Sequence, residues 1–283
     1  MGESSGSKEQ SVSGKTTRLS PFGLRTFALA NQKGGVGKTT TAINLGTALA
    51  AAGKKVLIFD VDPQGNAATG LDIRPEDRAH SSYDVLVGAC SFDEAVMPTL
   101  VPNLFIIAGS QDLSGLETEL MQQERPQYRM RDALAAAKIV GGYDYLLIDC
   151  PPSLNILTVN ALTASDAVIV PLQCEFFALE GLKQLLDTVG LVQRNLNPQL
   201  DIQGIVLTMH DKRTSLSDQV AADVRHHLGD KVYDTVIPRN VRLSEAPSFG
   251  KPAIIYDIKA PGSQAYLALA RELLAREGVA AAA

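Results

Sequence analysis

The chain of 283 residues lacks the features of a membrane protein, a disulfide scaffold or a metal cluster. It has no run of about twenty consecutive apolar residues, so we expect no membrane-spanning helix. Its three cysteines, Cys90, Cys150 and Cys174, are widely separated and form no C-x-x-C pair, which argues against disulfides and metal ligation. No signal-peptide pattern is present, and we therefore expect a cytoplasmic protein.

Basic charge is also scarce. The chain has 26 Lys and Arg against 31 Asp and Glu, and its net charge of −5 argues mildly against a protein dedicated to nucleic acid. It contains no helix-turn-helix or zinc-finger pattern, so we expect no sequence-specific reading of DNA. Non-specific binding needs only local neutralisation of phosphates, which a basic face could still provide.

Apolar strand-like and helix-like segments alternate along most of the chain. Residues 1–24 are rich in Ser, Gly, Lys and Glu and are predicted to form a disordered tail, whereas residues 25–283 are predicted to form one domain. Strands are predicted near 26–31, 55–60, 104–108, 143–149, 167–171, 202–208 and 232–237. Helices are predicted near 40–52, 127–139, 154–164, 178–193, 216–228 and 263–276. This alternation predicts an α/β fold with a twisted, mostly parallel sheet and helices on both faces.

A glycine-rich segment between the first strand and the first helix predicts a phosphate-binding loop. It reads Lys33-Gly34-Gly35-Val36-Gly37-Lys38-Thr39-Thr40. The glycines let backbone N–H groups turn toward phosphate oxygens, and Lys38 adds a mobile positive charge. Thr39 is placed to bind Mg²⁺ and Thr40 to reach the α-phosphate. The usual first glycine of such a loop is replaced by Gln32. The segment as a whole predicts a P-loop nucleotide-binding protein.

Acidic residues follow two further predicted strands, where parallel strands would bring them to one edge of the sheet. Asp149 ends the strand near 143–149 and is read as the Walker B aspartate, which would hold Mg²⁺ through water. Asp60 and Asp62 follow the strand near 55–60, where a carboxylate can order water. The alternative for Asp60 and Asp62 is a structural role in capping the turn.

The arrangement K-G-G-x-G-K-T-T, with its additional lysine Lys33, resembles the deviant Walker A loop of the ParA/MinD superfamily. Residues 207–216 and 237–252 resemble two segments of ParA/Soj-type chromosome-partitioning ATPases, and the resemblance extends from Arg25 to Glu277. It implies a Mg²⁺-dependent ATPase that forms an ATP-dependent homodimer, in which Lys33 reaches the partner's nucleotide.

The same resemblance implies roles for individual residues. Asp62, in the segment D-x-D-P-Q-G-N, would position the attacking water, and Asp60 would assist on the metal side. Pro238 and Asn240 would line the adenine pocket, unless they form only a capped proline turn.

The resemblance also implies partners. Arg213 and Arg242 match motif positions at which family members contact DNA, and Lys251 is a further basic candidate; for each, the alternative is an ordinary solvated charge. A ParB-type centromere-binding protein would stimulate hydrolysis, and the protein would associate with the nucleoid.

Three other classes share this ATP chemistry. A MinD-like membrane switch would need an amphipathic C-terminal anchor, but the chain ends in Gly278, Val279 and four alanines, and we expect no such anchor. An iron–sulfur protein would need cysteine ligands, which the spacing of the cysteines does not favour. An amidoligase would need a small-molecule pocket that the sequence does not identify.

Overall fold

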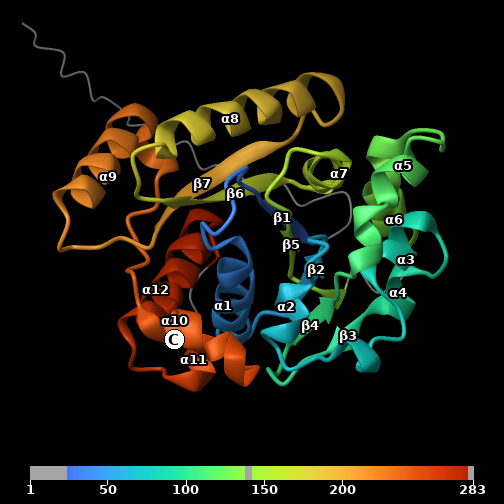
Figure 1. The fold of residues 1–283 in the computed structure, drawn as a ribbon, viewed down its shortest axis with the longest axis horizontal. Helices are drawn as coiled ribbons and strands as arrows, with labels where there is room; N and C mark the ends of the chain where they lie inside the picture. Colours follow the sequence, from blue (N-terminus) through green and yellow to red (C-terminus); the bar gives the residue numbers. More distant parts are fainter. Residues whose placement is uncertain (1–23, 138–141, 280–283) are drawn as a thin grey trace, which may run out of the picture.

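The computed structural model describes residues 24–137 and 142–279, and its central element is a seven-stranded sheet. The strand order is β3-β4-β2-β5-β1-β6-β7, and all neighbouring strands pair in parallel except β3 and β4 (Figure 1). The strands are β1 (Arg25–Leu29), β2 (Val56–Asp60), β3 (Met97–Pro98), β4 (Leu104–Ile107), β5 (Tyr145–Asp149), β6 (Ala167–Gln173) and β7 (Asp201–Thr208). The predicted α/β class with a mostly parallel sheet is therefore confirmed.

Helices cover both faces of the sheet, as predicted. Figure 1 shows α7 and α8 on one side of the sheet and α1 and α12 on the other. The helices are α1 (Lys38–Ala51), α2 (Asn66–Thr69), α3 (Ser82–Val87), α4 (Phe92–Ala95), α5 (Leu116–Leu120), α6 (Arg129–Ala136), α7 (Ile156–Ala164), α8 (Ala178–Asn195), α9 (Ser215–Leu228), α10 (Val241–Glu245), α11 (Ala253–Tyr256) and α12 (Pro261–Arg276). Within the described ranges, none of these helices is long and apolar enough to span a membrane.

The sheet separates two hydrophobic cores because successive residues of a strand point to opposite faces. Val56 and Ile58 of β2 pack in the core beneath α1 and α12, whereas Leu57 and Phe59 pack in the core beneath α6, α7 and α8. Every residue of β2 is buried. Such uninterrupted apolar runs are typical of parallel strands covered on both sides.

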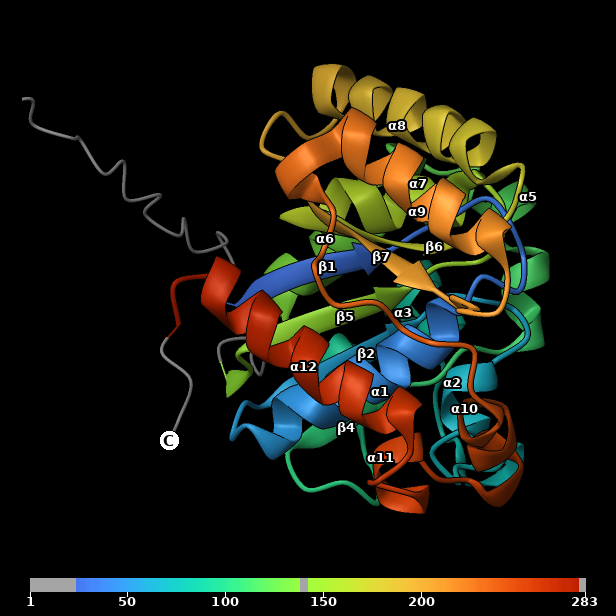
Figure 2. The same cartoon turned by 90° about the vertical axis from the view of Figure 1, so that its left-hand side faces the viewer.

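The parallel register brings the predicted acidic residues to one edge of the sheet. Asp149 of β5 lies opposite Asp60 of β2 on one side and opposite Leu29 of β1 on the other. In Figure 2 the arrowheads of β1, β5 and β7 point to the same edge, where the segment joining β1 to α1 also lies. This carboxyl edge is the usual ligand position in open α/β sheets.

The predicted strand over 232–237 is wrong. Its residues make only isolated bridges beside the sheet, between Ile205 and Val232 and between His210 and Pro238. The backbone N–H groups of Asp234 and Thr235 donate to the carboxylate of Glu272 in α12, at 2.8 and 2.9 Å, instead of to a strand. The N–H groups of Tyr233 and Ile237 still donate to the carbonyl oxygens of Ile205 and Leu207 in β7, both at 2.9 Å. The side chain of Glu272 therefore interrupts the ladder that the sequence pattern suggested, and no regular strand forms.

Other differences concern short elements. The helix predicted over 127–139 is shorter, with α6 preceded by a 3₁₀ turn at Pro126–Tyr128. Its last two predicted residues, 138 and 139, lie outside the described residues, as do residues 1–23 of the predicted tail. The sequence did not indicate β3, α2 to α5, α10 or α11, all of which span six residues or fewer.

Close packing at Gly204 of β7 gives a test of the fold. A Cβ at this position would lie 2.5 Å from the ring of Tyr233 and 3.0 Å from the carbonyl oxygen of Lys231. Gly204→Ala should therefore lower the free energy of unfolding by about 1–3 kcal/mol, measured by urea denaturation. Gly181→Ala in α8 is the control, because nothing lies within 4 Å of its added Cβ. An equal loss in both variants would contradict the packing argument.

Candidate nucleotide-binding site

The segment Lys33–Gly37 forms a tight turn between β1 and α1, and Lys38, Thr39 and Thr40 form the first turn of α1. Gly35 and Gly37 have φ angles of 74° and 90°, a left-handed conformation that favours glycine. The hydroxyl of Thr208, at the end of β7, donates to the carbonyl oxygen of Val36 at 2.8 Å. Asn31 donates to the carbonyl oxygen of Pro171 in β6 at 2.8 Å and accepts from the Lys33 N–H at 3.0 Å. The turn is thus fixed by two strands in a shape suited to bind phosphate.

Lys38 is the buried cation of this turn. Its Nζ donates to the carbonyl oxygen of Lys33 at 3.1 Å, across the loop. Burial lowers the pKa of Lys38 below its usual range, and the nearby carboxylates of Asp149 and Asp62 partly oppose this shift. A phosphate at the loop would supply the anionic partner that a buried ammonium requires.

Asp60 and Asp149 are both fully buried at the ends of adjacent strands. Burial raises the pKa of Asp149 to about 7, against smaller opposing effects of the Thr39 hydroxyl and Lys38. The pKa of Asp60 is also raised well above its usual range, by burial and by the charge of Asp149. Asp60 accepts N–H groups of Asp62 at 3.0 Å and Ala67 at 3.3 Å, so it organises the loop after β2.

The surroundings of Asp149 suit a divalent cation. Both of its carboxylate oxygens are buried without a hydrogen bond of regular geometry, although the Thr39 hydroxyl lies close enough to lower its pKa. No group of three or more His, Cys, Asp and Glu residues in the described ranges could hold a metal by itself. Mg²⁺ typically binds through one or two protein oxygens together with substrate phosphates and water. Thr39 and Asp149 could provide such protein ligands.

Asp62 lies beside these groups in the loop that follows β2. Its Oδ1 accepts the N–H of Gln64 at 3.0 Å, and its carbonyl oxygen accepts the N–H of Gly65 at 3.0 Å. A Cβ on Gly109, after β4, would lie 2.6 Å from that carbonyl oxygen, so only glycine fits there. This packing fixes the loop and leaves Asp62 partly exposed at the edge of the site.

A cavity of about 460 Å³ adjoins the phosphate loop. Gly37 and Thr40 form one side, and Met209, Pro238 and Asn240 are among the residues that form the rest. The Oδ1 of Asn240 also caps α10 by accepting the Arg242 N–H at 3.2 Å. Both residues predicted for the adenine pocket therefore line a cavity beside the loop, and Asn240 has the capping role as well.

The remaining predicted residues lie outside this centre. Lys33 points to Glu175 of its own chain, with 2.6 Å between Nζ and Oε2. Lys251 is exposed and lines a second cavity of about 270 Å³, together with Thr39 and Thr40.

Two predicted DNA-contacting arginines are exposed but paired with acidic neighbours. Arg213, before α9, makes two bonds of 2.8 and 2.6 Å to Asp211 and holds the pKa of that carboxyl well below its usual range. Arg242, in α10, lies 2.8 Å from Glu245 and 3.5 Å from Asp257. The backbone N–H of Arg239 donates to the His210 carbonyl oxygen, and this link joins the loop before α9 to the segment leading into α10.

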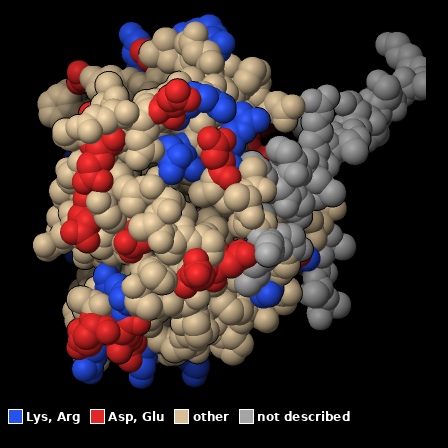
Figure 3. Space-filling model, turned by 90° about the vertical axis from the view of Figure 1, so that its right-hand side faces the viewer, with Lys and Arg blue, Asp and Glu red and all other residues tan. Residues whose placement is uncertain are grey.

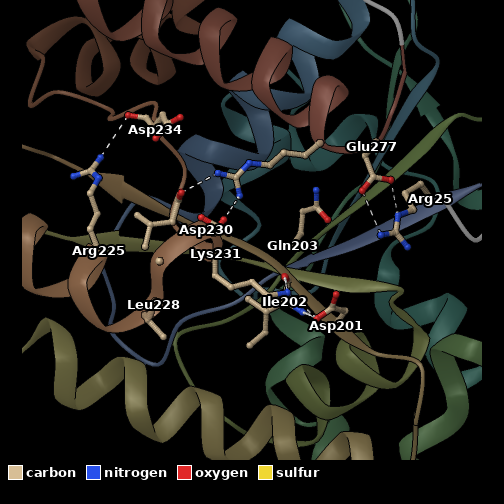
Figure 4. Close-up of a pocket in the computed structure, with 13 residues that line it drawn as sticks. Arg25, Asp201, Ile202, Gln203, Arg225, Leu228, Asp230, Lys231, Asp234 and Glu277 are labelled. Atoms are coloured by element: carbon tan, nitrogen blue, oxygen red, sulfur yellow. Dashed lines mark hydrogen bonds and ion pairs between the residues drawn. The ribbon is translucent and has the colours of Figure 1, made fainter. Parts of the chain in front are cut away.

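A cavity of about 1080 Å³ at the opposite, amino edge of the sheet has a different character (Figure 4). The charged residues around it pair with one another: Arg25 lies 2.8 Å from Glu277, and Lys231 lies 3.0 Å from Asp201. None of the residues predicted to bind nucleotide lies there. This network joins β1 and β7 to the end of α12 and is remote from the phosphate loop.

Several residues at the site were not found from the sequence. Asn31, Thr208 and Gly109 hold the loops through contacts with distant segments, and Glu175 pairs with Lys33 across 142 residues. Asn31 lies two residues after the end of β1, and this position beside the phosphate loop is the one local signal among them. The other three had none, because their roles arise only from the packing of separate strands.

The fold, the phosphate loop and the strand-end aspartates define a P-loop nucleotide-binding protein. Comparison with known proteins agrees: residues 24–202 match the family described as AAA domain. The chain is 65% identical over 254 residues to the chromosome partitioning protein ParA of Caulobacter vibrioides, covering 90% of this chain and 95% of that protein. It is 53% identical over 251 residues to the sporulation initiation inhibitor protein Soj of Bacillus subtilis, covering 89% of this chain and 98% of that protein.

A solved structure gives the same result for the fold. Cobyrinic acid a,c-diamide synthase from Mycobacterium smegmatis, with bound ATP analogue and magnesium, superposes with a TM-score of 0.77 at 38% identity, covering 89% of this chain and 94% of that one. The identity to ParA is much higher and extends over nearly the whole domain. The chain belongs to the ParA/Soj family of chromosome-partitioning ATPases.

The isolated carboxylate of Asp149 gives a test of the metal assignment. Without nucleotide at neutral pH, Asp149→Asn should raise the free energy of unfolding by roughly 1–3 kcal/mol, because it removes a buried charge beside Asp60. The same variant should lose the increase in ATP affinity that Mg²⁺ gives the wild type. Urea denaturation and ATP titration with Mg²⁺ or EDTA measure the two effects. Asp187→Asn on the exposed face of α8 is the control. A Mg²⁺ effect retained in Asp149→Asn would contradict the assignment.

Proposed function

We propose that this protein is a Mg²⁺-dependent ATPase that uses ATP to control its own dimerisation and its association with DNA. The observation that carries the proposal is the meeting of Lys38, Thr39 and Asp149 at one fixed phosphate loop. The ATP analogue and magnesium in the structure of the Mycobacterium smegmatis relative support the same cofactors here.

The residues of the site have distinct roles in phosphoryl transfer. The N–H groups of the loop and Lys38 bind the phosphates, and Thr39 and Asp149 hold Mg²⁺, with Asp60 beside them on the metal side. The ion, when bound, neutralises charge on the phosphate oxygens. Asp62 lies at the open side of the site, where a carboxylate orients the attacking water. Thr40 reaches the α-phosphate, and Pro238 and Asn240 bind the nucleoside in the adjoining cavity.

The proposed dimer depends on Lys33. Its side chain is exposed and paired with Glu175 instead of directed into its own phosphate loop, so it is not required by the phosphates of its own subunit. In the closed dimer each Lys33 contacts the nucleotide of the other subunit. ATP then couples dimerisation to DNA affinity, because only the closed form aligns the basic residues of both subunits.

The DNA-binding face is proposed to include Arg213, Arg242 and Lys251, which lie on the loop before α9 and on the segment from α10 to α11. Figure 3 shows a different face, formed by α3 to α6, where acidic and basic clusters alternate without a continuous basic band on the part drawn in colour. Local basic groups can bind duplex phosphates despite a net charge of −5. Through this contact the protein would associate with the nucleoid.

The proposed partner is a ParB-type centromere-binding protein that stimulates hydrolysis. The supporting observation is the similarity to ParA of Caulobacter vibrioides over 90% of the chain. A MinD-like role at a membrane remains the alternative that the DNA experiment below distinguishes.

Asp62 allows hydrolysis to be separated from binding. Asp62→Ala should retain ATP affinity within about twofold and lower turnover at least about 100-fold, because the phosphate loop is intact but the water is no longer oriented. Phosphate release and equilibrium ATP binding measure the two quantities. The control is Asp187→Ala, which removes an exposed carboxylate of α8. If Asp62→Ala loses ATP affinity instead, its role is to hold the loop or the metal.

Arg242 allows DNA binding to be separated from nucleotide binding. Arg242→Glu should weaken binding of a non-specific duplex at least about tenfold in the ATP state and reduce its dependence on salt, with dimerisation unchanged. Fluorescence anisotropy with ATP, ADP or no nucleotide across a salt series measures this. Arg194→Glu, an exposed charge reversal on α8, is the matched control.

Two results would count against the DNA proposal. If the wild type binds duplex equally in all nucleotide states, ATP does not control the association. If it binds no duplex in any state but binds anionic lipid vesicles with ATP, the cargo is a membrane.

A further inference from the structure

Two adjacent phenylalanines are exposed at the carboxyl edge of the sheet. Phe176 and Phe177 follow β6, and 75% and 64% of their surfaces are accessible. Their rings pack edge to face with centroids 5.1 Å apart, and Leu179 in the first turn of α8 is 37% accessible beside them in sequence. The chain has only eight phenylalanines, so the exposure of two together marks a contact surface. We call Phe176, Phe177 and Leu179 the aromatic patch.

The aromatic patch is fixed next to the phosphate loop. Glu175, which precedes Phe176, lies 2.6 Å from the ammonium of Lys33. The Ala178 N–H donates to the Glu175 carbonyl oxygen at 2.9 Å, and Cys174 is buried, so the turn that presents the two rings is anchored. The exposed rings therefore border the residue that is proposed to act on another subunit.

We propose that the aromatic patch is the apolar part of the contact between two copies of this chain, and that Glu175 holds Lys33 in its own subunit until the copies close. The inference rests on the proposed function, because it names the surface and the competing carboxylate of the proposed dimer. On closing, Lys33 leaves Glu175 for the phosphates of the other subunit, and the rings of both subunits become buried.

The charges around the aromatic patch favour a second copy as the occupant. The segment 175–183, which contains the aromatic patch, has two acidic residues, Glu175 and Glu180, and one basic residue, Lys183, and Glu175 pairs with Lys33. The segment therefore has no excess of cations. A two-fold symmetric contact must be complementary to itself, which paired charges around an apolar centre allow. DNA or an anionic membrane would instead require an excess of cations.

The size of the aromatic patch explains why closure would need ATP. Burying the exposed parts of four phenylalanine side chains removes roughly 400–700 Å² from water. Specific interfaces bury about 1,200–2,000 Å². The aromatic patch alone is therefore too small, and the closed dimer needs further contacts that form only with bound nucleotide, those of Lys33 among them. An exposed ion pair such as Lys33–Glu175 is weak, so a phosphate can displace it.

Sedimentation velocity with Mg²⁺ and a slowly hydrolysed ATP analogue tests the inference. The variant Phe176→Ser with Phe177→Ser should weaken dimerisation at least about tenfold, while ATP affinity measured on the dilute monomer stays unchanged. Glu175→Gln should tighten dimerisation about two- to fivefold, because Lys33 is no longer held. Leu191→Ser, which replaces an apolar residue 54% exposed on α8, is the matched control and should have no effect.

Each outcome separates the inference from the proposed function. If the wild type does not dimerise with the analogue, the proposed function fails. If the wild type dimerises and the double variant dimerises equally well, the aromatic patch is not the contact. If the double variant dimerises normally but loses DNA or vesicle binding, the aromatic patch serves another partner. Unchanged or weaker dimerisation of Glu175→Gln overturns the role of Glu175.

Discussion

The proximity of two buried carboxylates, Asp60 and Asp149, is the constraint on which the site depends. The parallel register places them side by side, and burial raises the pKa of each. Two buried carboxylates cannot both be ionised at low cost unless positive charge lies nearby. The fold provides Lys38 on the adjacent turn, and the oxygens of Asp149 that lack regular hydrogen bonds leave room for a cation. Nucleotide and metal together would thus complete an electrostatic arrangement that the folded chain leaves unbalanced.

The rigidity of the site comes from contacts between its loops. The hydroxyl of Thr208 bonds the phosphate loop to the end of β7, and the next residue, Met209, lines the cavity of about 460 Å³. Asn44 of α1 joins the same region by accepting the Ala253 N–H at 2.8 Å while donating to the Thr40 carbonyl oxygen at 2.9 Å. Hydrogen bonds therefore connect the first turn of α1, which follows the phosphate loop, with α11.

Local signals explain how much could be predicted from the sequence. The buried strands and the phosphate loop were predicted because apolar runs and glycines act within a few residues. The prediction of a strand over 232–237 was wrong because Glu272, far along the chain, accepts the N–H groups of Asp234 and Thr235 in its middle. The site's aspartates were found as strand ends, but the pairing of Lys33 with Glu175 depends on segments 142 residues apart. Contacts between residues so far apart in the chain produce no periodic pattern in a single sequence.

The ion pair between Arg25 and Glu277 joins residues 252 apart at the amino edge of the sheet. It places the start of β1 and the end of α12 together, on the side opposite the phosphate loop (Figure 2). A tag attached directly before β1 or directly after α12 would therefore be joined on the side opposite the phosphate loop and the aromatic patch. The geometry also favours circular permutation, since a short linker could join these neighbouring ends and new termini could be opened in an exposed loop elsewhere.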